Sequence, residues 1–338
     1  MSPTQTRPLF GIVLMLLAGA CFTVLDATAK YLVATVPVLM VLWVRYVMQA
    51  VLSSALMAAA GQHTIVRTRH PWLQAFRGLL LLASSLMAVF SLKYMPLAEF
   101  TAVVMITPVV VSLFSVFVFG ERLGPVGWGL LVASFAGTLL IVKPAGSFYG
   151  WAALFPFACT VLAAMYQLVS ARLGRTDPPT TTHLLSVWIA AGVATLGAPV
   201  AWSPVSDPAV WAWMCLMGLM GALGHLLLAH AYRHASALML APFHYATLIW
   251  AVLVGWLVFD HTSDPWAWAG IGLIVSCGLL KTRLQAQALR RAMSPAAPAP
   301  PSVSLPPATP AAQTPAVAAR PDGAAVPTPI ATTQGGRR

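Results

Sequence analysis

The chain has 338 residues, of which 59% are hydrophobic and 8% are charged, and its formal net charge is +11. Roughly a quarter of the residues in an ordinary soluble domain are charged, so this composition excludes a soluble globule. The apolar residues form runs of about 20, the length that a helix needs to cross a bilayer. Residues 101–119 are continuously apolar rather than alternating, which excludes a transmembrane β-barrel. The sequence therefore predicts an all-α integral membrane protein.

Ten membrane-spanning helices are predicted, and their short connections make neighbouring helices antiparallel. The expected spans are 9–30, 37–58, 72–92, 97–119, 126–143, 149–171, 183–202, 210–231, 236–259 and 266–281. The fifth and tenth spans are rich in glycine, and the eighth has a face of small residues formed by Gly218, Gly221 and Gly224. Small residues let helix backbones approach closely in a membrane, so these three spans are expected to pack tightly.

The basic residues gather on one side of this arrangement. With a cytoplasmic N-terminus, the inner side holds Arg7, Arg67, Arg69, Arg77, Arg122, Arg172, Arg175, Arg233, Lys281, Arg283, Arg290, Arg291 and the three arginines of the C-terminal tail. The outer side receives Lys30, Lys93 and Lys143, and Arg45 lies within a span. Cytoplasmic loops are enriched in Lys and Arg, so both termini are expected in the cytoplasm. The positive charge is therefore explained by the orientation of the chain in the lipid bilayer, which is its expected partner. No nucleic-acid partner is expected.

The two halves of the chain are related by a shift of 140 residues. The shift aligns Thr107 with Thr247, Leu113 with Leu253, Val118-Phe119 with Val258-Phe259, Pro125 with Pro265 and Trp128 with Trp268. Each repeat holds five spans, an odd number, so the second must enter the membrane in the opposite orientation to the first. Inverted-topology repeats of this kind recur among secondary transporters.

The chain is expected to divide into four parts: a cytoplasmic N-terminus at 1–8, a first five-helix repeat at 9–143, a second at 149–283, and a tail at 284–338. The tail is rich in Pro, Ala and Thr and is expected to be disordered in the cytoplasm. The cysteines lie singly inside apolar runs, which predicts core packing rather than a disulfide or a metal site, at Cys21, Cys159, Cys215 and Cys277.

Asp26, Lys30 and Arg45 are ionisable residues within or at the ends of spans, where such groups usually face protein or a water-filled cavity. Asp26 and Lys30 are four residues apart and therefore share a helix face. All three are expected to meet in one outward-opening polar pocket that binds substrate. An ion pair of Asp26 with Arg45 or Lys30 that only locks the first two helices together is the alternative.

Aromatic and imidazole side chains are expected to complete the lining of this pocket. The candidates are Trp43, Tyr46, His225, His244 and Trp250. Such a lining suits a planar ligand with a polar edge, through stacking and a few directed hydrogen bonds. For any one tryptophan, a place in the interfacial belt or the core is the commoner alternative, and for each histidine a satisfied core position.

Three further residues are candidates for coupling and movement. Glu99 stands at the outer entrance of the fourth span and is expected either to titrate in a coupling step or simply to interact with the helix dipole. Pro108 and Pro242 lie at near-equivalent places in the fourth and ninth spans. Each is expected to kink its helix, free a backbone carbonyl and act as a hinge beside the central cavity.

A family resemblance follows from the first half of the chain. Residues 92–102, the pair Thr107-Pro108, residues 119–122 and the end of the fifth span at 141–144 resemble the first EamA domain of the drug/metabolite transporter superfamily. The resemblance covers roughly residues 9–283. It implies a ten-helix permease of two inverted EamA repeats, in the inner membrane of a bacterial cell, that moves a small metabolite by alternating access.

The second half departs from the family pattern at two places. Asp260-His261 replaces the Gly-Glu of that pattern, and Leu248 stands where the first half has Pro108. The second domain is therefore assigned mainly from the phase of the repeat. Within the superfamily, residues 25–31, 43–46 and 77–84 are similar to a subgroup that includes bacterial riboflavin importers and S-adenosylmethionine carriers.

The leading hypothesis for the small-molecule substrate is riboflavin, taken up into the cell. Its isoalloxazine ring would stack on Trp43, Tyr46 or Trp250, while the charged candidates address its polar edge. Export of amino acids or related metabolites, and S-adenosylmethionine transport, are alternatives within the superfamily. A membrane enzyme or scaffold is the alternative from another class. The sequence has no phosphate-binding loop and no zinc-protease motif, so neither an enzymatic activity nor a cofactor is expected, and the oligomeric state stays open.

Overall fold

The computed structural model describes residues 8–59, 61, 68–119, 124–142, 150–174, 176–235 and 237–293. Its α-helices are α1 (Pro8–Leu32), α2 (Val38–Ala59), α3 (Pro71–Tyr94), α4 (Leu97–Val104), α5 (Thr107–Phe119), α6 (Pro125–Val142), α7 (Leu154–Leu173), α8 (Pro179–Ala201), α9 (Pro208–His234), α10 (Ala237–His244), α11 (Ala246–Phe259) and α12 (Pro265–Met293). A short 3-10 helix, η1 (Gly150–Ala153), leads into α7. Within these residues there is no β-strand.

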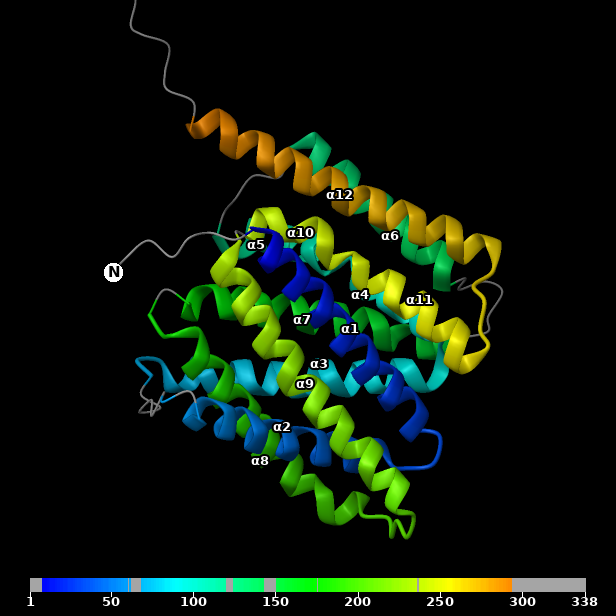
Figure 1. The fold of residues 1–338 in the computed structure, drawn as a ribbon. Helices are drawn as coiled ribbons and strands as arrows, with labels where there is room; N and C mark the ends of the chain where they lie inside the picture. The colour runs from blue at the N-terminus through cyan, green and yellow to red at the C-terminus, as the bar shows by residue number, and fades with distance from the viewer. Residues whose placement is uncertain are drawn as a thin grey trace, which may run out of the picture. The chain divides into compact units, whose positions relative to one another are not determined.

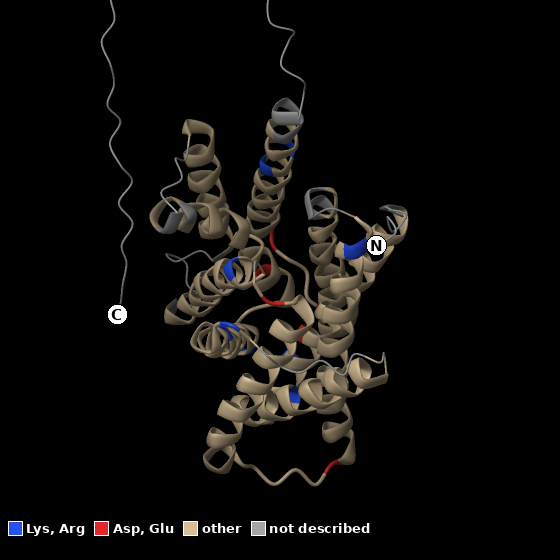
Figure 2. Ribbon diagram, turned by 90° about the vertical axis from the view of Figure 1, so that its left-hand side faces the viewer, with Lys and Arg blue, Asp and Glu red and all other residues tan. Residues whose placement is uncertain are grey.

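The helices confirm the predicted all-α membrane fold of ten spans. Eight segments of the described chain are long and apolar enough to cross a membrane, and the shorter apolar helices α6 and α11 belong to the fifth and ninth spans. The fourth span consists of α4 and α5, and the ninth of α10 and α11. Figure 2 shows how few Lys, Arg, Asp and Glu residues these helices carry. The chain is therefore a multi-pass membrane protein.

Several helices begin where the sequence offers a proline in the first turn. The starts of α3, α8, α9 and α12 all carry one, and proline suits this position because its missing N–H would have no partner there. Asp207 caps α9 by accepting a hydrogen bond from the backbone N–H of Ala209 at 2.8 Å. Asp264 caps α12 in the same way, accepting from Trp266 at 2.9 Å and from Ala267 at 3.0 Å. The helix α12 begins at Pro265 and α6 begins at Pro125, two positions that the repeat shift of 140 residues relates.

The fourth and ninth spans are broken at equivalent places. The first break lies at Met105 and Ile106 and the second at Tyr245, and the repeat shift places Met105 on Tyr245. Proline cannot bond the carbonyl four residues before it, so Pro108 leaves the carbonyl of Val104 free. The Thr107 hydroxyl donates to that carbonyl at 2.6 Å and satisfies it.

Helices from the two halves pack against one another in pairs that the repeat relates. α1 packs on α9 as α7 packs on α3, and α2 packs on α9 as α8 packs on α3. Likewise α1 contacts α11 as α7 contacts α5. The pairs α2 with α8 and α6 with α12 each join a helix to its own counterpart, and Figure 1 shows them at opposite ends of the bundle. These reciprocal contacts are those of two inverted repeats that interdigitate.

Glycines permit the closest helix approaches, as predicted for the fifth, eighth and tenth spans. A Cβ atom at Gly270 of α12 would lie 2.5 Å from the backbone oxygen of Gly137 on α6. On α9, a Cβ atom at Gly224 would lie 2.8 Å from the ring of Phe22 on α1. The small-residue face of α9 is thus a packing surface. The largest buried apolar cluster surrounds it and draws on α1, α2, α3 and α8.

Two expected span ends differ from the helices. The helix α12 continues past 281, the expected end of the tenth span, to Met293. Residues 284–293 contain mainly good helix formers such as Leu, Gln, Ala and Arg, and the first proline after them is Pro295. The helix of the seventh span, α8, begins at Pro179 rather than at 183, so His183 lies one turn inside it. Residues 1–7 and 294–338, which include most of the expected terminal segments, lie outside the described residues.

Candidate functional site

A buried arginine on α2 forms the centre of the candidate site. Arg45 is 8% exposed, and its Nε atom has no hydrogen-bond partner in the part of the chain that the structure describes. Its guanidinium carbon lies 5.1 Å from the centre of the neighbouring Tyr46 ring. Asp26 on α1 is close enough for the Arg45 charge to act on its carboxylate. The side chains of Asp26 and Arg45 do not form a salt bridge, however. The alternative in which an ion pair between them locks the first two helices together is therefore not seen.

Gln49 lies one helical turn after Arg45 on the same face of α2. Its side chain is fully buried, and neither the nitrogen nor the oxygen of its amide has a partner among the described residues. The small-residue face of α9 passes directly over this pair. A Cβ atom at Gly221 would lie 2.8 Å from the Gln49 amide oxygen, and one at Gly218 would lie 3.2 Å from the Arg45 carbonyl oxygen. The first and second halves of the chain therefore meet at Arg45 and Gln49.

Lys30 does not join Asp26 and Arg45 as the sequence suggested. Its Nζ atom donates to the carbonyls of Leu92 and Met95, both at 2.9 Å, and so binds the C-terminal end of α3. Cations are stabilised at this end of a helix because the last carbonyls there lack partners. Glu99 in the first turn of α4 is 3% exposed and pairs instead with His261, at 3.1 Å between Oε1 and Nε2. Lys30 lies within electrostatic reach of Glu99, and we call Lys30, Glu99 and His261 the Glu99 cluster.

The predicted aromatic residues of α2 point in different directions. Trp43 donates from its indole nitrogen to the Thr195 hydroxyl at 3.0 Å and lies against Trp202, so it faces α8. Tyr46 is fully buried and exchanges a hydrogen bond of 2.6 Å with the Ser85 hydroxyl of α3. Only Tyr46 therefore remains in contact with Arg45.

The predicted histidines occupy two separate places. His225 of α9 contacts Phe22 edge to face at 5.1 Å and His183 of α8 at 4.8 Å, between ring centres. This ring group lies within electrostatic reach of Arg45. His244 is the last residue of α10, next to the break in the ninth span, and Trp250 of α11 is 36% exposed. In the described ranges no three His, Cys, Asp or Glu side chains are placed to hold a metal ion.

Arg77 on α3 is a second buried arginine, which sequence reasoning counted only among the inner-side charges. It is 7% exposed. Its Nε atom donates to the Ser170 hydroxyl at 2.7 Å, and its two terminal nitrogens donate to the Thr182 carbonyl at 2.8 Å, the Ser186 hydroxyl, and the Tyr166 hydroxyl at 2.5 Å. The guanidinium also lies 4.3 Å from the centre of the Tyr166 ring. Arg77 thus fastens α3 to α7 and α8.

Asp177, between α7 and α8, ties together two loops at the other end of α3 from the Glu99 cluster. It accepts hydrogen bonds from the Thr68 hydroxyl, from the Gln74 amide at 2.8 Å and from the backbone N–H of Arg69 at 3.4 Å. Burial raises the pKa of Asp177, but hydrogen bonds from these groups and from Thr176 outweigh it, so the pKa is lowered. We call this group the Asp177 tie.

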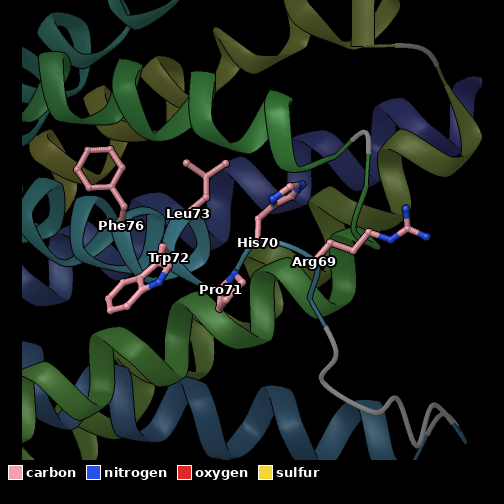
Figure 3. A pocket seen from close by; sticks show the side chains of 6 residues that line it. All are labelled: Arg69, His70, Pro71, Trp72, Leu73 and Phe76. Carbon is pink, nitrogen blue, oxygen red and sulfur yellow. The ribbon is translucent and has the colours of Figure 1, made fainter. Parts of the chain in front are cut away.

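A surface hollow of about 440 Å³ lies at the start of α3, next to the Asp177 tie, to which the backbone of Arg69 contributes. It is lined by Arg69, His70, Pro71, Trp72, Leu73 and Phe76 (Figure 3). Trp72 is 88% exposed, which fits the interfacial belt of tryptophans that the sequence predicted at span ends. Buried, unpaired polar atoms mark a transport pathway better than an exposed apolar hollow does, so the candidate site is the group around Arg45.

Two stretches of the chain, residues 9–143 and 150–280, match the EamA-like transporter family. The chain belongs to this family. A riboflavin transporter from Rhizobium johnstonii is 28% identical over 86% of this chain and 96% of its own length. A pseudopaline exporter from Pseudomonas aeruginosa is 29% identical over 79% of this chain and 94% of its own length. An S-adenosylmethionine uptake transporter from Rickettsia conorii is 22% identical over 84% of this chain and 96% of its own length.

A solved crystal structure shares the EamA fold of this chain. It aligns with a TM-score of 0.57 over 84% of this chain and 99% of its own length, at 21% sequence identity. In the present chain, the group around Arg45 lies where α1 and α2 of the first half meet α9 of the second half. The Glu99 cluster and the Asp177 tie join elements at opposite ends of α3. The buried polar centre is therefore bounded at both ends by contacts between the halves.

Proposed function

We propose that this chain is a secondary transporter that takes up riboflavin across the bacterial inner membrane. The observation that carries the proposal is the set of buried, unpaired polar atoms on α2, the Nε atom of Arg45 and the amide of Gln49. Such atoms cost free energy within a membrane unless a ligand satisfies them in part of the working cycle. Relatives from Rhizobium johnstonii and Vibrio cholerae that bear the name riboflavin transporter support the choice of substrate.

The substrate binds, in this proposal, between the two halves at the group around Arg45. Asp26 and Arg45 supply the charges, and Tyr46 with the ring group of His225 supplies flat surfaces for an isoalloxazine ring. Trp43 and Trp250 contribute less, because Trp43 is engaged with α8 and Trp250 is partly exposed. Lys30 acts through the Glu99 cluster, at one end of the pathway.

Alternating access follows from the inverted repeat. One end of the pathway closes when the Glu99 cluster forms, and the other closes when the Asp177 tie forms. The breaks beside Pro108 and Pro242 let the fourth and ninth spans bend while His244 and its surroundings move with them. Substrate held at Arg45 then faces one side of the membrane at a time.

Export of a carboxylate metabolite is a second candidate function. The buried charges favour it, because the two cationic side chains of Arg45 and Arg77 outnumber the one carboxylate, Asp26, that lies within reach of Arg45. The excess positive charge would attract an anionic substrate. The relative named pseudopaline exporter belongs to that class of activity. Riboflavin stays the first choice because every donor nitrogen of Arg77 already has a partner within the protein.

Uptake of labelled riboflavin tests the proposal. Cells that cannot make riboflavin would express the chain or its Arg45→Ala variant, at membrane levels matched by immunoblot. We expect rapid uptake with the natural chain, competition by unlabelled riboflavin, and little competition by amino acids or S-adenosylmethionine. Equal uptake with and without the chain contradicts the proposal. Release of labelled amino acids from loaded cells would then support the export function instead.

A further inference from the structure

We propose that Gln49 and Arg45 together read the cyclic imide edge of the substrate's ring system, so that Gln49 determines specificity. This inference rests on the proposed function, because the pyrimidine ring of riboflavin carries such an edge. The imide presents a carbonyl acceptor, a ring N–H donor and a second carbonyl acceptor in a row. The side chains on α2 offer the opposite order of groups.

The burial of Gln49 is the first observation that supports this assignment. Its side chain has no exposed surface, and both of its amide atoms lack a partner among the described residues. The large majority of buried side-chain polar atoms in proteins are hydrogen-bonded, so a doubly unpaired amide requires an explanation. Gln74 on α3 differs, because its amide nitrogen is bound to Asp177 and Thr182 and only its amide oxygen lacks a partner among the described residues.

The arrangement of donors and acceptors is the second observation. An unpaired primary amide offers an adjacent N–H donor and carbonyl acceptor, which pair with a ring carbonyl and a ring N–H. The Arg45 Nε atom, one turn away on the same helix face, is a further unpaired donor for the second ring carbonyl. Donor, acceptor and donor on the protein thus match acceptor, donor and acceptor on the imide.

The small-residue face of α9 is the third observation. A Cβ atom at Gly221 would lie 2.8 Å from the Gln49 amide oxygen, so even alanine would crowd this atom. The Gly221 backbone therefore packs directly against the Gln49 amide from the side of the second half. A flat ring can approach Gln49 when α9 withdraws from α2, which is the movement of the halves that alternating access requires.

Binding of two flavins to the purified full chain in lipid nanodiscs tests the inference. The probes are riboflavin and 3-methylriboflavin, in which a methyl group replaces the imide hydrogen, and binding is followed by quenching of flavin fluorescence. The methyl group removes the donor and leaves the Gln49 carbonyl unpaired, so we expect at least about tenfold weaker binding by the natural chain. In Gln49→Leu both flavins should bind with equal, reduced affinity.

The thermal stability of the ligand-free protein gives an independent measurement. Leucine in place of an unpaired buried amide removes an unsatisfied group, so Gln49→Leu should keep or raise the melting temperature. The control Gln74→Leu removes an amide whose nitrogen is bound to Asp177 and Thr182, so it should lower the melting temperature while the ratio of the two affinities stays as in the natural chain. Gln49→Met, with a flexible side chain of similar length, serves if the leucine variant does not assemble.

The outcomes separate the two proposals. Equal binding of both flavins by the natural chain, or discrimination that persists in Gln49→Leu or Gln49→Met, overturns the role of Gln49 and leaves riboflavin transport intact. A lower melting temperature of the ligand-free Gln49→Leu variant, with discrimination retained, assigns Gln49 a structural role and also overturns the inference. No binding of either flavin by the natural chain overturns the proposed function and this inference with it.

Discussion

Two buried arginines on neighbouring helices have opposite surroundings. Every donor nitrogen of Arg77 has a partner in α7 or α8, whereas the Nε atom of Arg45 has none within the described chain. A guanidinium stays protonated at any accessible pH, so neither residue escapes its desolvation by losing a proton. The protein itself satisfies Arg77, whereas in the proposed function the substrate is the partner of Arg45. The two residues should therefore respond differently to substitution.

Replacement of Arg45 should reduce transport more than assembly. Arg45→Ala removes a donor that nothing else in the described protein uses, so the amount of folded protein in the membrane should stay near normal. Arg45→Lys keeps the charge but loses the planar, forked donor geometry, and uptake should fall in both variants. Uptake of labelled riboflavin at matched expression measures this. Loss of folded protein in Arg45→Ala, with recovery in the double variant with Asp26→Ala, would show a structural pair instead.

Replacement of Arg77 should destabilise the protein. Arg77→Ala leaves the hydroxyls of Tyr166, Ser170 and Ser186 without their donor, at about 1–3 kcal/mol for each buried group that stays unpaired. Arg77→Lys cannot reach all of these acceptors from one nitrogen and should be intermediate. Melting in detergent, followed by size-exclusion chromatography, measures the loss. An Arg77→Ala protein that melts like the natural chain would contradict the fastening role.

The positions of the helices could be predicted from the sequence, whereas the partners of individual side chains could not. The starts at Pro71, Pro179 and Pro265 follow from proline chemistry, and the breaks in the fourth and ninth spans lie close to Pro108 and Pro242. The end of α12 was missed because charged helix formers after 281 reduce hydropathy without ending a helix. Expected spans set the depth of each residue but not the direction in which it points, so Gln49 was not singled out.

The candidate site was partly predictable for the same reason. Arg45 and Asp26 are conspicuous as charges inside apolar runs, and the structure does bring them near each other. Lys30 lies near the end of α1, where the unpaired carbonyls of α3 compete for it. A polar residue one turn from an intramembrane arginine is the signal that would have found Gln49.

The contribution of the Asp177 tie to the stability of the folded protein should be lost at low pH. The pKa of Asp177 is lowered in the folded protein, so its contribution to stability is fully present above the unfolded aspartate pKa of about 3.9 and is lost as pH falls through the folded value. Asp177→Asn should lower the melting temperature at pH 7, and the difference from the natural chain should shrink below about pH 4. A difference that stays constant with pH would contradict a role for the carboxylate charge.

At the scale of the molecule, contacts between distant loops agree with the span count. The Asp177 tie joins the connection before the third span to the connection before the seventh, and Glu99 joins the connection before the fourth to His261 before the tenth. The first two connections each follow an even number of spans, and the second two each follow an odd number. The two members of each pair therefore lie on the same side of the membrane. A missing or extra span between them would have put partners on opposite sides.

The orientation of the whole molecule is the remaining prediction, and it rests on charge. The loop segments around Arg69 and Arg172, and the end of α9 at Arg233, share the side of the Asp177 tie, and positive loop residues favour the cytoplasm. Green fluorescent protein fused after Met293 should therefore fluoresce, because that position lies on the same side after ten crossings. Alkaline phosphatase inserted between α8 and α9, near Ser206, should be active outside. Phosphatase activity after Met293 would reverse the orientation, and activity at both positions would contradict the ten-span count, since an odd number of crossings separates them.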